Sequence, residues 1–294
     1  MINLIRTMKK ILILWVLGWL WISQIGVAQN APQVLLLDLK PENYFSFKQQ
    51  ETYQLYGDKE GKSLIHEFSK TRNVFLQVEK RIGSLIYVKL TYSNIMFSDA
   101  DSLSPDFEPY KKWFHSLDGS VLRMVLHTTG EIANVQESDS LKIHALELAK
   151  AQNLTDTVRI LKYFEYFFSD NSIREEFESL LKIYLPKKVK EGDKWRTKLP
   201  TYKEYKSNIR NEVLFVGQSE EAYSFRVVSK INSKRSFLDH LFKASEIVGE
   251  RQTVYRLDLK HRFPRTVNSV VHYKINPQKE EKHYLKVIID WQRL

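Results

Sequence analysis

The chain has no cysteine in its 294 residues, and this absence removes several classes of chemistry. No disulfide can form, no thiolate can act as a nucleophile, and no zinc site can use cysteine ligands. A lipoprotein anchor is excluded as well, because that acylation needs a cysteine at the cleavage site. The fold must therefore be stabilised by its apolar core, which a chain of this length can supply.

Catalytic motifs are absent too: the sequence has no G-x-S-x-G, H-E-x-x-H, P-loop or G-x-G-x-x-G pattern. None of the eight histidines has an i, i+4 partner on a predicted helix that would chelate zinc. The acidic run from Asp99 has Ser104 and Tyr110 where an EF-hand needs glycine and glutamate. Asp239 and His240 are adjacent, so in a strand they face opposite sides. We therefore predict no catalytic residue, no cofactor, no metal site and no enzymatic activity.

Long apolar runs are missing, with one exception at the N-terminus. Residues 11–22 are apolar, three basic residues precede them, and small residues stand just before Gln29. This order indicates a secretory signal over residues 1–28, because the apolar run is shorter than the roughly 20 residues of a spanning helix. The alternative is an uncleaved anchor over residues 11–28. We expect an exported protein, periplasmic or extracellular, with no membrane span after cleavage.

The net charge of +10 at pH 7 raises the question of acidic partners. Basic residues gather near Lys188, Lys230 and Arg262, and aromatic residues near the last group would suit single-stranded nucleic acid. Export argues against nucleic acid, whereas an anionic lipid or glycan is compatible with it. The simplest interpretation is a solvated surface that keeps the protein soluble.

Alternating apolar and polar residues predict a first β unit over residues 29–136. Strands are expected at 44–56, 63–81 and 85–97, and a hairpin at 121–135. One face of each long strand is apolar, which is typical of a sheet that is wet on its other face.

Helical periodicity replaces this alternation over residues 137–185, where three helices are predicted. Phe164, Phe167 and Phe168 lie on the second of them, and they are candidates to line an apolar ligand site. The alternative is that they pack on the sheet, as aromatic residues at helical spacing usually do.

A second β unit is predicted over residues 186–294. It opens with a turn at Gly192 and Asp193, followed by the large aromatic Trp195. Glycine permits the left-handed backbone of such turns, aspartate can bond its own backbone there, and an indole buries much apolar area. We expect these three residues to form a structural anchor.

The opening of the second unit resembles an earlier stretch of the chain. Residues 39–45 and 189–195 share an order of apolar residue, lysine, two turn residues, Asn or Asp, any residue, and an aromatic. Long strands follow both copies. We therefore predict a β-rich α+β fold of two strongly curved antiparallel sheets, arranged as a pseudo-duplicated half-barrel or a sandwich, with the helical segment between them.

The same residues carry a resemblance to a known family. A Lys-x-x-Asn-x-aromatic start, a Thr-Thr-Gly-Glu hairpin at 128–131 and the box Pro-x-x-Val-x-x-Gly-Asp-x-Trp at 186–195 occur in this order. Together they resemble uncharacterised secreted proteins of Bacteroidota, of the domain of unknown function 6263 type. The first copy departs from the box, with Glu42 and Asn43 in place of Gly-Asp. The resemblance implies a location and an architecture, but no activity.

Two functions fit these observations. One is an exported cell-envelope protein that holds a lipid or another apolar ligand between sheet and helices. The alternative is a non-enzymatic envelope protein that contacts a partner through exposed strands and basic loops. A hydrolase would require the fold to bring together an acid, a histidine and a nucleophile, and no sequence motif indicates such a set.

Overall fold

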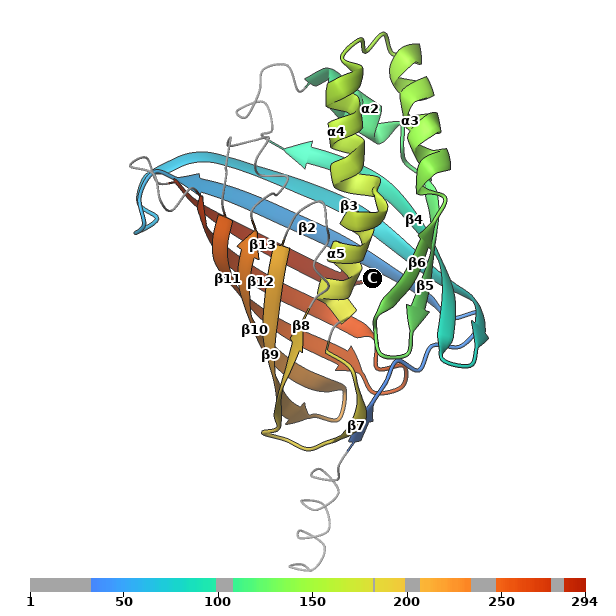
Figure 1. Cartoon of the computed structure of the whole chain (residues 1–294), viewed down its shortest axis with the longest axis vertical. Helices are drawn as coiled ribbons and strands as arrows, with labels where there is room; N and C mark the ends of the chain where they lie inside the picture. Colours follow the sequence, from blue (N-terminus) through green and yellow to red (C-terminus); the bar gives the residue numbers. More distant parts are fainter. Residues whose placement is uncertain (1–32, 99–107, 182, 199–206, 234–246, 276–282) are drawn as a thin grey trace, which may run out of the picture.

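A computed structural model describes residues 33–98, 108–181, 183–198, 207–233, 247–275 and 283–294 (Figure 1). The predicted signal over residues 1–28, the start of the acidic run at Asp99 and the pair Asp239 and His240 lie outside these ranges. The strands are β1 (Gln33–Leu35), β2 (Tyr44–Tyr56), β3 (Leu64–Ile82), β4 (Leu85–Ser98), β5 (Val121–His127), β6 (Ile132–Gln136), β7 (Leu185–Val189), β8 (Lys194–Lys198), β9 (Ser207–Gln218), β10 (Ala222–Ser233), β11 (Ile247–Asp258), β12 (Pro264–Ile275) and β13 (His283–Arg293). The helices are α2 (Glu108–His115), α3 (Ser138–Ala151), α4 (Thr157–Phe168) and α5 (Asp170–Leu181).

The β-rich class and the antiparallel pairing are confirmed. Eleven strands form one sheet in the order β6-β5-β4-β3-β2-β13-β12-β11-β10-β9-β8, and β1 pairs with β7 in a second, two-stranded sheet. Two antiparallel sheets are present as predicted, but they do not correspond to the two β units, because β13 pairs with β2 and strands of both units share the large sheet. The hairpin of β2 with β3 leaves the other edge of β2 free, and the C-terminal strand covers that edge. The large sheet stays open, since β6 and β8 at its two ends do not pair with each other.

Side chains alternate between the two faces of the sheet, as the sequence predicts. Along β2 the buried positions recur at every second residue from Phe45 to Leu55. Trp291 of β13 is on the same face as Phe45, and its ring centroid lies 5.9 Å from that of Phe177 in α5. We call this helix-facing side the inner face and the opposite side the outer face.

The helices cover part of the inner face, beside β4, β5 and β6 (Figure 1). The three helices predicted within residues 137–185 are present as α3, α4 and α5. Helix α2 was not predicted, because two turns are too short to show a helical period. It buries Trp113 and Phe114, and the indole Nε1 of Trp113 donates a hydrogen bond to the carbonyl oxygen of Ala145 at 2.8 Å.

Two separate apolar clusters lie within the fold. The larger one combines the four helices with the inner face of most strands. The smaller one contains Tyr53, Leu55, Phe68, Ile209, Ile231, Ile247, Val271, Ile275, Leu285 and Val287. Buried polar side chains accompany the smaller cluster: Asn211, Ser229 and Arg251 oppose one another on three adjacent strands.

A buried ionic network connects the sheet to α5. The Nζ of Lys70 lies 2.9 Å from Oε1 of Glu51, and the guanidinium of Arg72 pairs with the carboxylate of Glu176 in α5. Gln49 links the two pairs, because its amide donates to Glu51 at 2.6 Å and its Oε1 accepts from Arg72 Nε at 2.5 Å. The network therefore fixes the position of the helix on the sheet by charge as well as by apolar packing.

Burial and ion pairing have opposite effects on the pKa values of Glu51 and Lys70. Burial alone would raise the pKa of Glu51, but the charges of Lys70 and Arg72 outweigh it and hold that pKa below its usual value. Burial lowers the pKa of Lys70, and the attraction of Glu51 offsets this only in part. Both pKa values are lowered, which favours the charged form of Glu51 but the neutral form of Lys70, because Glu51 faces two cations whereas Lys70 also faces the like charge of Arg72.

Candidate functional site

The three phenylalanines proposed for a ligand site are buried in the larger apolar cluster. Phe164, Phe167 and Phe168 are 2%, 8% and 1% exposed. Ring centroids of Phe168 and Tyr92 lie 5.8 Å apart, and those of Phe167 and Phe114 lie 4.8 Å apart. These are contacts of helix with sheet and of helix with helix, and neither cavity discussed below includes any of the three residues.

The Gly-Asp-x-Trp box forms a tight turn that leads into β8. Gly192 has a φ of 86°, and Asp193 Oδ2 accepts a hydrogen bond from the backbone N–H of Lys190 at 3.0 Å. The turn is tied to β9, because Gly192 N–H donates to the carbonyl of Phe215 and Phe215 N–H donates to that of Asp193. Trp195 is 7% exposed, and its ring meets that of Phe225 edge-on at 6.2 Å.

The first copy of the turn has the same hydrogen-bond pattern. Glu42 takes the left-handed position with a φ of 72°, and Asn43 Oδ1 accepts from the backbone N–H of Lys40 at 2.7 Å. Glu42 N–H donates to the carbonyl of Val78, whose N–H donates to that of Asn43. Phe45 is buried at the position of Trp195. The sequence echo therefore corresponds to two turns of matching geometry.

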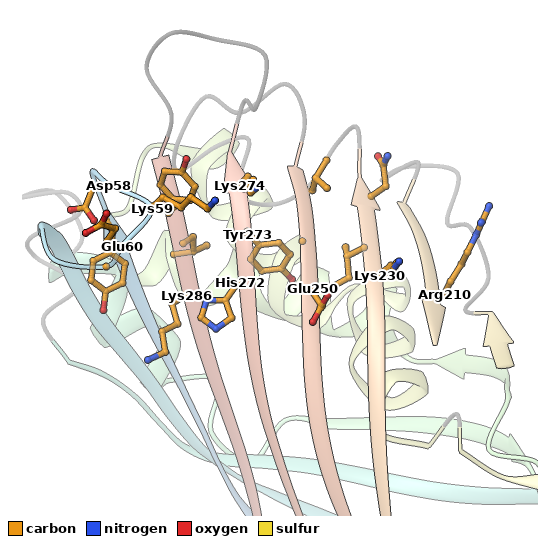
Figure 2. Close-up of a pocket in the computed structure, with 18 residues that line it drawn as sticks. Asp58, Lys59, Glu60, Arg210, Lys230, Glu250, His272, Tyr273, Lys274 and Lys286 are labelled. Carbon is orange, nitrogen blue, oxygen red and sulfur yellow. The ribbon is translucent and has the colours of Figure 1, made fainter. Parts of the chain in front are cut away.

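A groove on the outer face is the main candidate for a functional site (Figure 2). It has a volume of about 940 Å³ and crosses one end of strands β2 and β9–β13, beside the hairpin between β2 and β3. Alternate residues of the strands place these side chains on it: Tyr56, Arg210, Lys230, Asn232, Val248, Glu250, His272, Lys274, Tyr284 and Lys286, joined by hairpin residues 58–61. The lining combines apolar and aromatic surface with a majority of basic charges.

The acidic side chains of the groove already have partners. Asp58 accepts hydrogen bonds from the Ser63 hydroxyl and from the backbone N–H of Lys62, which lowers the pKa of its carboxyl to about 2. Glu60 forms an ion pair with Lys62, and Glu250 Oε1 accepts from the Gln252 amide at 3.2 Å. In contrast, no lysine or arginine of the groove forms an ion pair within the part of the chain that the structure describes. The groove thus presents uncompensated positive charge.

A smaller cavity of about 410 Å³ lies between α3 and the segment before β5. Asp118 and His144 line it, but the Asp118 carboxylate accepts hydrogen bonds from the backbone N–H groups of Asn94 and Ile95. The Asp118 carboxylate therefore stabilises the backbone of β4 at Asn94 and Ile95. Within the described ranges, no three histidine or acidic side chains are close enough together to hold a metal ion, and no helix is long and apolar enough to cross a membrane.

The sequence reasoning missed the groove because it followed the apolar side of each strand. In β12, for example, Val267 and Val271 mark the inner face, whereas His272 and Lys274 lie on the other. The sequence signal was the basic residues among the outward positions of β10, β12 and β13. Combining them requires the register of the four strands β10–β13, which alternation within one strand does not specify.

Comparison with known proteins gives a family but no activity. The model of a family of unknown function (DUF6263) matches residues 85–264, from β4 to the start of β12, and includes the box at Gly192 but not the earlier turn. No curated protein matches the chain. A solved structure that concerns lipid–protein interactions in lipovitellin is similar with a TM-score of 0.43 and 8% identity, over 87% of this chain. The chain spans 25% of that structure's length, and a likeness this low supports no argument about function.

Proposed function

Because the chain belongs to DUF6263, a family of unknown function, we propose its function from its own geometry: an exported cell-envelope protein that binds a lipid or another apolar ligand in the outer-face groove. The observation that carries this proposal is the groove itself. Its volume of about 940 Å³ is at the upper end of the roughly 300–1,000 Å³ that ligand pockets usually have.

The apolar part of the lining supports an apolar ligand. Val248 and Tyr284 lie on the groove from β11 and β13, and Tyr56 contributes from β2. They are surrounded by charged residues, and such a mixture suits a molecule with one apolar and one polar part. The location differs from the expected one between sheet and helices, because side chains of the larger cluster occupy that space.

A binding role is favoured over a hydrolytic one by the groove's residue types. No serine, threonine or cysteine is among the described residues that line it. Its single histidine, His272, stands opposite Glu250 and Lys286 in the strand register, so its two cross-strand neighbours are charged side chains and not hydroxyls. The described lining therefore lacks the serine, threonine or cysteine of a nucleophile–histidine–acid triad.

The proposal is tested with the neutral apolar probe N-phenyl-1-naphthylamine, whose fluorescence rises on transfer to an apolar site. We expect saturable binding to the purified chain and a loss of affinity of up to about tenfold in Val248→Asn, since one apolar contact is removed from the groove. Val254→Asn is the matched control, because Val254 lies on the same face of β11 and outside the groove. Absence of saturable binding, or an equal loss in both variants, would contradict the proposal.

Export is tested separately from binding. The signal-like run predicts that the protein recovered from cells begins at Gln29 and is found in the envelope fraction. Intact-mass measurement of that protein decides between cleavage after residue 28 and a retained anchor. A full-length chain in the cytoplasmic fraction would refute export and leave the ligand proposal standing.

One observation favours the alternative of a partner-binding protein. The large sheet ends in the edge strands β6 and β8, and a helix side chain contacts the edge of β6. Arg174 of α5 donates hydrogen bonds to the carbonyls of Ile132 and Ala133 in β6, whereas no described strand pairs with the outer edge of β8. An open edge can accept a strand from another protein. Co-purification of an envelope protein that is lost in Arg196→Glu, on β8, would favour this alternative.

A further inference from the structure

Charged and polar side chains of the groove form a row across the sheet, in which basic residues stand on both sides of Glu250. Arg210 opposes Lys230, Lys230 opposes Glu250, Glu250 opposes His272, and His272 opposes Lys286 in the strand register. Figure 2 shows the row on neighbouring strands. Because adjacent strands are about 4.8 Å apart, the row extends over about 19 Å.

Two cations stand side by side at one end of this row. Arg210 and Lys230 are direct neighbours on β9 and β10, a placement that is unfavourable for like charges on one face of a sheet. Both side chains are exposed, and neither has an acidic partner among the residues that the structure describes. An anion placed between them would relieve this repulsion and accept hydrogen bonds from both.

The rest of the groove compensates this charge only in part, through Glu250 opposite Lys230. Its five cations, Lys59, Arg210, Lys230, Lys274 and Lys286, face three acids. Two of the acids, Asp58 and Glu60, belong to the hairpin and are engaged by Ser63 and Lys62. Val248, an apolar residue of the groove, lies on the next strand, β11, two positions from Glu250. Anionic and apolar recognition are therefore adjacent.

We infer that the groove recognises the phosphate group of an anionic amphiphile, with Arg210 and Lys230 holding the phosphate and the apolar part lying over Val248 and Tyr284. This inference rests on the proposed function and adds the chemical class of the ligand. Arginine suits the task because its planar guanidinium can donate two hydrogen bonds to one phosphate. Lys274 and Lys286 add positive potential along the ligand's path.

The test compares two amphiphiles of equal chain length, dodecyl phosphate and dodecyl maltoside, below their micelle concentrations by titration calorimetry. We expect the wild-type chain to bind the phosphate at least tenfold more tightly at low salt, with the preference falling as salt screens the exposed charges. Arg210→Gln combined with Lys230→Gln should remove most of that preference and leave maltoside affinity within twofold. Arg226→Gln is the control, because Arg226 is exposed on the same face of β10 outside the groove.

The outcomes separate the two proposals. Equal affinity for both amphiphiles, or a phosphate preference that the double variant keeps, would overturn the inference while the apolar-ligand function stands. Binding of inorganic phosphate alone as tightly as dodecyl phosphate would also overturn it, because the apolar part would then contribute nothing. Failure of both amphiphiles to bind would contradict the proposed function itself.

Discussion

Replacing Arg72 with methionine is expected to lower the free energy of unfolding by about 3–5 kcal/mol. Its side chain is 2% exposed, pairs with Glu176 of α5, and lies with its guanidinium carbon 4.4 Å from the centre of the Tyr92 ring. Methionine keeps the apolar volume but removes the cation that pairs with the Glu176 carboxylate, whose side chain is only 14% exposed. The measurement is urea unfolding of the purified chain at pH 7, followed by tryptophan fluorescence.

The double variant Arg72→Met with Glu176→Met separates loss of a partner from the value of the pair. Replacing both members of a buried ion pair by apolar residues is often close to neutral, so we expect the double variant to recover most of the lost stability. Arg123→Met is the exposed comparison, since Arg123 forms surface pairs with Glu79 and Glu137, and its effect should be much smaller. An Arg72 variant as stable as wild type would mean that the network does not hold α5 on the sheet.

The strands were predictable from the sequence because each one carries its own signal. Alternation located β3 and β4 to within one residue at each end, since a half-buried strand repeats every two residues. Helix caps are less predictable: the N-cap of α4 is Asp156, which accepts from Arg159 N–H, although the neighbouring Thr155 is also a residue type that caps helices. Adjacent capping residues compete, and a single sequence does not specify which of them caps the helix.

The pairing of β13 with β2 could not be predicted, because it joins segments more than two hundred residues apart. The sequence of neither strand indicates which strand it will pair with. The candidate groove depends on that pairing, since Tyr56 and the hairpin at Asp58 come from one end of the chain and Lys286 comes from the other. For Phe164, Phe167 and Phe168 the sequence signal was local, because helical spacing indicated that they are buried. The sequence alone does not distinguish a packed core from a ligand pocket.

The echo between the two turns was predictable, and its geometry gives the second large prediction. The seven shared positions correspond to two turns with matching hydrogen bonds, each followed by a buried aromatic residue, Phe45 in one and Trp195 in the other. Duplication of the two β units stays a prediction, which the matching turns motivate. Each aromatic is buried at the start of the strand that follows its turn, Phe45 on β2 and Trp195 on β8.

Trp195→Ala is therefore expected to lower the free energy of unfolding by about 3–5 kcal/mol, the usual range for a buried aromatic truncated to alanine. The indole is 7% exposed, stands on β8 opposite Val213, and its removal leaves a cavity beside Phe225. Phe45→Ala should have an effect of similar size, whereas Tyr44→Ala, at a side chain that is 58% exposed, should stay within about 0.5 kcal/mol. Urea unfolding of the three variants provides the comparison. A Trp195 variant that unfolds with the wild-type midpoint would show that the box does not anchor β8, and the surface around Trp195 would then be examined as a contact site for a partner.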